Sequence, residues 1–274
     1  VSASDIDSLV KLAQSLDVDL VIVGPEAPLV AGLSDELRQN GIPSFGPHAA
    51  GAMLEGSKDF AKQVMLDLGI PTAGVQHLTA DSNLDEAVDR WGSPWVVKRD
   101  VLAGGKCVVV TEDRDEAIEF IQTSIESDSM VLLEEFLEGE EASMLVMMDE
   151  SGYVALPCSQ DHKRVGEGDE GLNTGGMGAY APAPVVTEEV HRRAISEIVE
   201  PMHSFLSAQE IPYRGCLYVG LMISTDGSPS VVEYNVRFGD PETQVIMPRI
   251  GSDFLKLLLQ INRKNEFEKN KLII

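Results

Sequence analysis

The sequence predicts an α/β protein whose strands and helices alternate along most of the chain. Short runs of β-branched and aliphatic residues occur at 17–23, 95–98 and 215–223. Segments with apolar residues at helical spacing lie between them, for example over 5–16 and 188–207. At 274 residues, of which 43% are hydrophobic, the chain can bury a substantial core and is expected to form more than one domain.

Residues 1–56 are expected to form the second half of a Rossmann-like domain. The expected order is helix, strand, helix and strand, over residues 5–16, 17–23, 29–40 and 42–45. This order is that of an α/β unit, whose first half would lie upstream of Val1. The chain does not begin with Met, so a processed, excised or incomplete chain is expected. The small residues of 47–56 then indicate a connecting segment.

A second domain is expected over 57–264, followed by a charged tail over 265–274. Ser57 can cap a helix that runs to Leu68, where Gly69 follows. A small subdomain is expected next, with one short helix over 83–91 and a strand, strand, helix and strand over 95–98, 107–111, 113–124 and 130–136. The remaining elements would form a larger subdomain, with strands within 142–157, a Gly-rich loop, a helix over 188–207 and strands over 215–223 and 230–236.

Charge limits the classes of partner. The 45 acidic and 21 basic residues give a net charge of −24, which argues against nucleic acid or an anionic membrane as a partner. Seven of the basic residues fall in the motifs below, as a site for a polyanion requires: Lys58, Lys98, Arg99, Lys106, Lys163, Arg164 and Arg237.

The three cysteines indicate the compartment. Cys107, Cys158 and Cys216 are isolated, which suggests reduced thiols and a cytoplasmic location. No apolar run approaches the length of a membrane span, and the first residues lack the pattern of a signal peptide.

Polar groups suited to a metal ion and to phosphate follow the strand expected over 230–236. Glu233 and Asn235 are two residues apart and point to the same face of an extended chain, which Arg237 continues. A carboxylate and an amide carbonyl are hard oxygen ligands of the kind that Mg²⁺ prefers, and a guanidinium fits phosphate bidentately. This triplet alone is equally expected on an exposed strand, but the Gly-Asp-Pro-Glu of 239–242 favours a site.

Two further features suit an anion. Lys98 ends an apolar strand, where a phosphate group is a natural partner and a strand-end Lys reaching solvent is the alternative. Residues 166–178 contain six glycines in thirteen positions and follow Lys163 and Arg164. Such a loop permits close approach to an anion, whereas a flexible linker is the alternative. His162 is interpreted as a structural or positioning residue, because no catalytic triad or metal-ligand spacing surrounds it.

Four blocks of the sequence resemble the phosphoribosylamine–glycine ligase family of purine synthesis, in the family's order. They are Val-Gly-Pro-Glu-Ala-Pro-Leu at 23–29, Leu-Glu-Gly-Ser-Lys at 54–58, the segment 159–180 that begins Ser-Gln-Asp-His-Lys-Arg, and 233–244, which ends Arg-Phe-Gly-Asp-Pro-Glu-Thr-Gln. The resemblance implies a partial Rossmann-like N-terminal domain followed by a two-lobed ATP-grasp domain, with residues 73–136 as its lid. It also implies ATP-dependent joining of glycine to 5-phosphoribosylamine, with Mg²⁺ or Mn²⁺, through glycyl phosphate.

The resemblance also implies roles for particular residues. ATP would be bound by Lys58, Lys98, Lys106, Glu134, Glu135, Phe136, Leu137 and Glu141. The substrates would be bound by Glu26, Asp161, Lys163, Arg164, Thr174, Gly175, Gly176, Asp240 and Glu242. Arg237 and Lys98 would be catalytic by neutralising phosphate, while Glu233 and Asn235 would bind the metal. From the residues alone, an acidic turn between two strands is more often a solvated loop, so the resemblance carries this assignment.

The sequence departs from the family in the loop over 99–107. The family pattern is Lys-Ala-Asp-Gly-Leu-Ala-Ala-Gly-Lys-Gly, and Arg99, Val101 and Cys107 replace its Ala, first Gly and last Gly. If either glycine position needs a positive φ, we expect strain there and weaker closure over ATP.

Both ends of the sequence also differ from the family pattern. The family's Gly-Asn-Gly-Gly-Arg-Glu-His motif and its further C-terminal domain are absent from this sequence, so N- and C-terminal segments acting in trans are expected partners. One alternative is therefore an ATP-binding fragment, or half of a split enzyme, with little activity alone. Another is a different ATP-grasp enzyme such as a carboxylase, against which the Gly-Asp-Pro-Glu-Thr-Gln of 239–244 argues.

Overall fold

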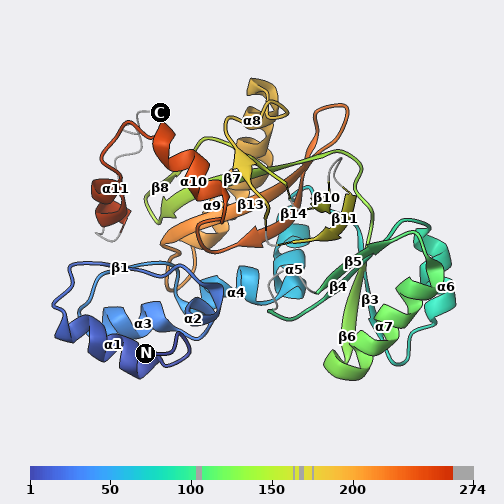
Figure 1. The fold of residues 1–274 in the computed structure, drawn as a ribbon, viewed down its shortest axis with the longest axis horizontal. Helices are drawn as coiled ribbons and strands as arrows, with labels where there is room; N and C mark the ends of the chain where they lie inside the picture. Colours follow the sequence, from blue (N-terminus) through green and yellow to red (C-terminus); the bar gives the residue numbers. More distant parts are fainter. Residues whose placement is uncertain (103–106, 163, 167–169, 175, 262–274) are drawn as a thin grey trace.

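The structure, a computed structural model, describes residues 1–261 apart from 103–106, 163, 167–169 and 175. Figure 1 shows an N-terminal unit of short helices in blue, a small subdomain with a green sheet at the other end, and a large subdomain between and above them. The large subdomain contains a second sheet, formed largely by strands from the later part of the chain.

The N-terminal unit contains two short parallel strands and four helices, which are α1 (Ile6–Ser15), β1 (Val21–Ile22), α2 (Glu26–Val30), α3 (Leu33–Gln39), β2 (Ser44–Phe45) and α4 (Ala49–Gly56). Two expectations were wrong here. The helix expected over 29–40 is two helices, because the backbone turns at Gly32 with a φ of +88°, a conformation that glycine adopts without strain. The segment 47–56, expected as a connection, is mostly helix α4, whose first turn is capped by the His48 side chain accepting the N–H of Gly51.

The small subdomain is an antiparallel sheet in the order β3-β6-β4-β5, and α6 and α7 cover one face of it (Figure 1). Its elements are β3 (Val75–Thr79), α6 (Leu84–Trp91), β4 (Trp95–Arg99), β5 (Val108–Thr111), α7 (Arg114–Asp128) and β6 (Met130–Glu134). The expected strand, strand, helix and strand are confirmed, whereas β3 was not expected.

Strand alternation sends the two faces of this sheet to different surroundings. Val97 and Leu133 pack with the helices in one buried cluster. Lys98 and Glu134, each one residue further along its strand, therefore point to the opposite face. In the β4–β6 register Lys98 lies opposite Leu132 and Val96 opposite Glu134, so the two charged residues are diagonal neighbours on that face.

The large subdomain is built on an antiparallel sheet in the order β14-β13-β7-β8. Its elements are α5 (Lys58–Leu68), β7 (Glu140–Asp149), β8 (Gly152–Ala155), β9 (Gln160–Asp161), β10 (Arg164–Gly166), β11 (Glu170–Asn173), β12 (Ala179–Tyr180), α8 (Glu188–Ala194), η1 (Ile195–Val199), α9 (Glu200–Ser207), β13 (Gly215–Ile223), β14 (Pro229–Asn235), α10 (Glu242–Ile246), η2 (Met247–Arg249) and α11 (Phe254–Ile261).

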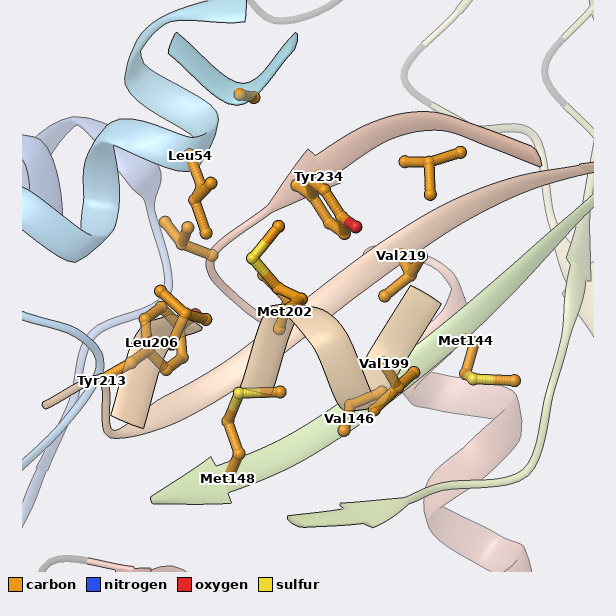
Figure 2. Packing of buried hydrophobic residues seen from close by; sticks show 14 of the residues in the cluster. Leu54, Met144, Val146, Met148, Val199, Met202, Leu206, Tyr213, Val219 and Tyr234 are labelled. Atoms are coloured by element: carbon orange, nitrogen blue, oxygen red, sulfur yellow. The ribbon is translucent and has the colours of Figure 1, made fainter. Parts of the chain in front are cut away.

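The largest core lies between this sheet and helices α4, α8 and α9 (Figure 2). Met144 and Val146 of β7 and Val219 of β13 contribute to it from the sheet, and Met202 contributes from α9. Leu54 of α4 belongs to the same cluster, so the N-terminal unit shares its core with the large subdomain. This packing fixes the end of α4 next to β14.

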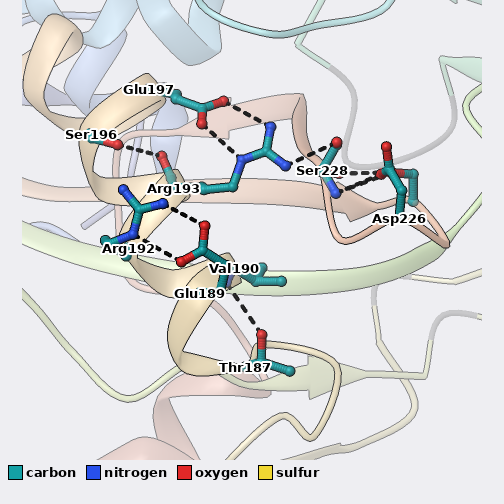
Figure 3. Close-up of polar contacts among 10 residues, drawn as sticks. Thr187, Glu189, Val190, Arg192, Arg193, Ser196, Glu197, Asp226 and Ser228 are labelled. Atoms are coloured by element: carbon teal, nitrogen blue, oxygen red, sulfur yellow. Dashed lines mark hydrogen bonds and ion pairs between the residues drawn. The ribbon is translucent and has the colours of Figure 1, made fainter.

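The helix expected over 188–207 is present but contains one π-helical turn, η1, between α8 and α9. Pro201 lies just beyond this turn and has no N–H to donate, which favours an irregularity there. Figure 3 shows that Arg193 contacts Glu197 one turn further along and donates to Ser228 Oγ at 3.0 Å. The helix is thereby connected to the turn between β13 and β14.

Two further observations concern the expected absence of a membrane span and the state of the cysteines. Among the described residues, no helix is sufficiently long and apolar to cross a membrane. Cys107, Cys158 and Cys216 are buried free thiols.

Candidate active site

A cleft of about 800 Å³ lies where the N-terminal unit, the small subdomain and the large subdomain meet. It brings together most of the residues that the sequence assigned to a site. Those that line it are Glu26, Lys58, Lys98, Glu134, Glu135, Phe136, Leu137, Glu141, Asp161, Thr174, Glu233, Asn235, Arg237, Asp240 and Glu242. Lys106, Lys163 and Gly175 lie outside the described residues, as does the side chain of Arg164.

The end of β14 presents one polar face to this cleft, as its spacing predicted. Asn235 Nδ2 donates to Glu233 Oε1 at 3.4 Å, and Arg237 Nη2 donates to Asn235 Oδ1 at 3.2 Å. The three side chains are therefore in contact in the order in which they occur on the strand. Two of them offer carboxylate and amide oxygens, and the third carries a fixed positive charge.

Arg237 is oriented by two carboxylates from the N-terminal unit. Its Nε lies 3.3 Å from Glu26 Oε2, and its Nη2 lies 3.1 Å from Glu55 Oε1. Burial opposes the charged form of Arg237, but Glu55 and Glu26 outweigh it and raise the pKa of the guanidinium above its usual value. Arg237 thus remains a cation whose position is restricted on two sides.

Glu55 is a site residue that the sequence reasoning missed. Its Oε2 accepts the main-chain N–H of Val236 at 2.7 Å, while its Oε1 contacts Arg237. Burial raises the pKa of Glu55 to about 7, although Arg237 and the Val236 N–H oppose the shift. The Leu-Glu-Gly-Ser-Lys block was a signal, but without the helix α4 nothing indicated that this carboxylate reaches β14.

Lys98 lies on the opposite wall of the cleft and is paired with a carboxylate. Its Nζ is 2.8 Å from Glu134 Oε2 and donates to the carbonyl of Val232 at 3.1 Å. Glu134, which was expected to bind ATP, lines the cleft with a side chain that is 4% exposed and that contacts two lysines. The second lysine is Lys62 of α5, which the sequence reasoning also missed.

The residues after Glu134 leave the sheet in an irregular segment that leads to β7. Glu135 donates its main-chain N–H to the carbonyl of Gly74, and its Oε2 accepts the N–H of Gly74 at 3.1 Å. Phe136 is 40% exposed and lines the cleft, as does Leu137. The segment therefore presents the apolar side chains of Phe136 and Leu137 to the cleft.

The first residues of the loop after β4 lie beside the N-terminus of α5. Asp100 Oδ1 accepts the main-chain N–H of Lys58 at 2.6 Å, and Ser57 Oγ donates to Asp100 Oδ2 at 2.9 Å. Lys58 Nζ donates to the carbonyl of Val101 at 3.1 Å, so the base of the loop is attached to the helix at several points.

The structure bears on two expectations about this loop. Positive φ among described non-glycine residues occurs at Asp17 and Ser129, so Val101 and Cys107 are free of that strain. Arg99 does not belong with the cations of the cleft, because its guanidinium pairs with Asp128 at the end of α7, with Nε 2.6 Å from Oδ2.

The Gly-rich segment approaches the Gly-Asp-Pro-Glu turn. Gly176 has a φ of +125°, and a Cβ there would lie 2.6 Å from Pro241 Cδ and 3.3 Å from the carbonyl oxygen of Asp240. Only glycine permits this approach. Asp240 accepts a hydrogen bond from Gln244, whereas the buried Glu242 accepts one from the hydroxyl of Tyr218 at 3.2 Å.

The two four-stranded sheets on either side of the cleft, with Lys98 on one and Glu233, Asn235 and Arg237 at the end of the other, define the chain as an ATP-grasp protein. Solved structures agree. The β-γ-ATP complex of the biotin carboxylase from Campylobacter jejuni has a TM-score of 0.74 at 16% identity over 99% of this chain and 60% of that one, which shows the fold alone. The expected ATP-grasp fold is therefore confirmed.

The chain belongs to the phosphoribosylglycinamide synthetase family. The model of the family's ATP-grasp (A) domain matches residues 56–243, and that of its N domain matches residues 1–55. The phosphoribosylamine–glycine ligases of Haemophilus influenzae and Vibrio vulnificus are each 48% identical to it, over 95% and 94% of the chain. The crystal structure of the Thermotoga maritima phosphoribosylamine–glycine ligase has a TM-score of 0.72 at 35% identity and covers 84% of this chain and 60% of that one. The chain spans 62% of the length of the two curated relatives.

Proposed function

We propose that this chain carries out the ATP-dependent joining of glycine to 5-phosphoribosylamine, which gives glycinamide ribonucleotide, ADP and phosphate. The observation that carries the proposal is the convergence of Lys98 with Glu233, Asn235 and Arg237 on one cleft from two different sheets. Relatives named phosphoribosylamine–glycine ligase, 48% identical over most of the chain, support the choice of substrates.

ATP is proposed to lie between the two sheets. The main-chain groups of the segment over 135–137 are suited to the edge of adenine, and apolar side chains such as Val96 and Met222 line the same cleft. Glu141 at the start of β7 would bind the ribose hydroxyls. Lys58 and Lys98 would reach the phosphates, and Lys106 remains a prediction for the same role.

A divalent cation, Mg²⁺ or Mn²⁺, is proposed at Glu233 and Asn235. The chemistry of the donor set fits such an ion, because Glu233 offers a carboxylate and Asn235 an amide carbonyl oxygen on the same face of β14. The Asn235 amide, which now directs its nitrogen to Glu233 and its oxygen to Arg237, would turn its oxygen toward the ion. When bound there, the ion would neutralise charge on the phosphates.

The chemistry that we propose has two steps. First the terminal phosphoryl group of ATP transfers to a carboxylate oxygen of glycine, which breaks its bond to the ADP oxygen and gives glycyl phosphate. The amine nitrogen of phosphoribosylamine then attacks the carbonyl carbon, phosphate leaves, and the nitrogen loses a proton. Both steps need positioning and neutralisation of charge, and a protein nucleophile is not required. Lys98 and Arg237 supply fixed positive charge, and Glu26 and Glu55 restrict the orientation of Arg237.

Glycine and the sugar phosphate are proposed to occupy the end of the cleft near the Gly-rich segment. Asp161, Thr174, Asp240 and Glu242 line the cleft, as does Glu26 beside Arg237, and Gly176 brings the loop close to Pro241. Lys163, Arg164 and Gly175 remain predictions for binding the sugar phosphate. The partners are thus small molecules, and neither nucleic acid nor a membrane is part of the proposal. We also propose that the protein is located in the cytoplasm.

The test is an assay with ATP, glycine and chemically generated phosphoribosylamine that counts ADP and phosphate. We expect one ADP and one phosphate for each glycinamide ribonucleotide formed, and little ADP when either glycine or phosphoribosylamine is omitted. Replacing the two substrates with bicarbonate and an acceptor suited to a carboxylase gives the control for another ATP-grasp reaction. ADP release that is independent of glycine would contradict the proposal.

A further inference from the structure

Lys62 is a buried cation that the proposed reaction does not use. Its side chain is 3% exposed, and its Nζ lies 2.9 Å from Thr72 Oγ1, 3.1 Å from the carbonyl oxygen of Ala73 and 3.2 Å from Glu134 Oε1. An ammonium group has three N–H donors, so all three have an acceptor within the fold. Burying a charge is costly unless it is paired in this way. We therefore infer that Lys62 has a role at this position.

Glu134 divides its carboxylate between two lysines. Oε1 contacts Lys62, and Oε2 lies 2.8 Å from Nζ of Lys98. The cluster therefore contains two ammonium groups and one carboxylate, with a formal net charge of +1. Burial lowers the pKa of Lys62, and the nearby Lys98 adds to that shift while Glu134 opposes it, as expected for two cations that share one anion.

All three members of this cluster line the cleft, and Lys98 is the most exposed of them, with a side chain 10% exposed against 3% for Lys62 and 4% for Glu134. Lys98 Nζ contacts Glu134 and the carbonyl of Val232 at 3.1 Å, which leaves one of its three donors without an acceptor among the described residues. That donor is available to an anion in the cleft only while Lys98 does not form a closer, one-to-one pair with the Glu134 carboxylate.

We propose that Lys62 is a positioning residue that keeps Lys98 available to the phosphates of a bound nucleotide by sharing the Glu134 carboxylate. Without Lys62, Glu134 and Lys98 form a one-to-one pair with no net charge, and Lys98 moves toward the carboxylate. With Lys62, the carboxylate is drawn to the α5 side and the cluster retains one positive charge beside the cleft. The inference rests on the proposed function in taking ATP as the source of the anion.

A purely structural role makes a different prediction. Thr72 Oγ1 donates to the carbonyl of Val231 at 2.8 Å, at the point where the chain enters the small subdomain, and Lys62 contacts the same hydroxyl oxygen. If Lys62 only stabilises this connection, the Thr72→Val variant would imitate its loss. If the charge of Lys62 is what matters, Thr72→Val would leave nucleotide binding almost unchanged.

The experiment measures the dissociation constant of ATP with Mg²⁺ by calorimetry, together with KM and kcat in the ligase assay. We expect Lys62→Met to weaken ATP binding at least about 10-fold, because Lys98 is then neutralised by Glu134. Adding Glu134→Gln to that variant should bring the constant back to within about threefold of the parent chain, since Lys98 then has no competing carboxylate. Thr72→Val, and Lys11→Met on the exposed surface of α1, should both stay within about threefold of the parent.

Several outcomes would overturn the inference. They are parent-like ATP binding by Lys62→Met, a double variant that binds no better than Lys62→Met, and a Thr72→Val variant as weak as Lys62→Met. If Lys62→Met does not fold, Glu134→Gln alone decides, because it keeps both lysines and should bind ATP at least as tightly as the parent. Binding more than about threefold weaker would then exclude the proposed sharing of charge. A parent chain that binds no ATP at all would overturn the proposed function and this inference with it.

Discussion

Glu55 Oε1 lies 3.1 Å from Nη2 of Arg237, and the second oxygen of the same carboxylate accepts the N–H of Val236. The end of α4 is thereby connected to the end of β14 through both a side chain and the main chain. One residue of the N-terminal unit thus orients a cation of the cleft.

This connection predicts a pH dependence of stability. The folded-state pKa of Glu55 is raised to about 7 from an ordinary value of 4.5, so between these values the folded chain holds a proton that the unfolded chain has lost. Stability therefore falls as pH rises from about 4.5 to 7, by on the order of 1 to 3 kcal/mol from this group. Glu55→Gln removes the carboxyl group that titrates. The free energy of unfolding of the parent minus that of the variant should therefore decrease from pH 4.5 to 7.

Urea unfolding of both chains at pH 5 and pH 7.5 measures that difference. The charged groups that face Glu55 are Arg237, Glu26 and Glu233, and all remain in the variant, so their own titration largely cancels. A difference that is constant, or that increases with pH, would show that Arg237 controls the ionisation of Glu55 more strongly than burial does.

The next prediction concerns the proposed cation. Glu233→Gln keeps an oxygen near Asn235 but removes the negative charge, so ATP hydrolysis that depends on Mg²⁺ should fall by about 100-fold or more. Unfolding by heat should stay close to that of the parent. Glu119→Gln, on the exposed face of α7, is the matched control and should leave turnover unchanged. Unaltered turnover in Glu233→Gln would exclude this side chain as a ligand.

The spacing of residues along strands predicted much of the site. Glu233, Asn235 and Arg237 share one face because of the two-residue repeat of β14. The position of Lys98 at the end of an apolar run predicted that its ammonium group emerges toward a partner. Both inferences depend only on the direction in which side chains point along a strand, which follows from the order of residues in the sequence.

The residues that were missed depend on packing between distant segments. Helix α4 has the sequence Ala-Ala-Gly-Ala-Met-Leu-Glu-Gly, whose small residues give weak helical periodicity, and several of its residues are buried among neighbouring elements. Without that helix, Glu55 could not be placed near Arg237. Lys62 appeared to be one of several polar residues on α5, because only the folded chain brings Thr72, Ala73 and Glu134 around its ammonium group.

The loop after β4 gives a prediction opposite to the one that the family pattern suggests. Val101 and Cys107 lie outside the positive-φ region, and Cys107 is 4% exposed. Val101→Gly with Cys107→Gly should therefore relieve no strain. It should lower stability by roughly 2 kcal/mol, from added backbone freedom and the loss of a buried side chain, without improving ATP affinity. Thermal unfolding and ATP titration of the double variant measure both effects, and tighter ATP binding would show that the loop needs glycine when nucleotide is bound.

The last prediction tests whether the approach of the Gly-rich segment to the Gly-Asp-Pro-Glu turn matters for turnover. Gly176→Ala would place a Cβ 2.6 Å from Pro241 Cδ, at a φ of +125°. Gly178→Ala is a matched control, because its φ of +156° is also unfavourable for alanine but no atom lies within 4 Å of the added Cβ. Both variants should lose stability through backbone strain, by about 1 to 3 kcal/mol. Only Gly176→Ala should move the loop away from Asp240, and so raise KM for glycine or phosphoribosylamine by about 10-fold or more while KM for ATP changes little. Equal effects of the two variants on all three KM values would mean that the loop acts through its backbone conformation alone, and that its contact with the turn plays no part in binding the substrates.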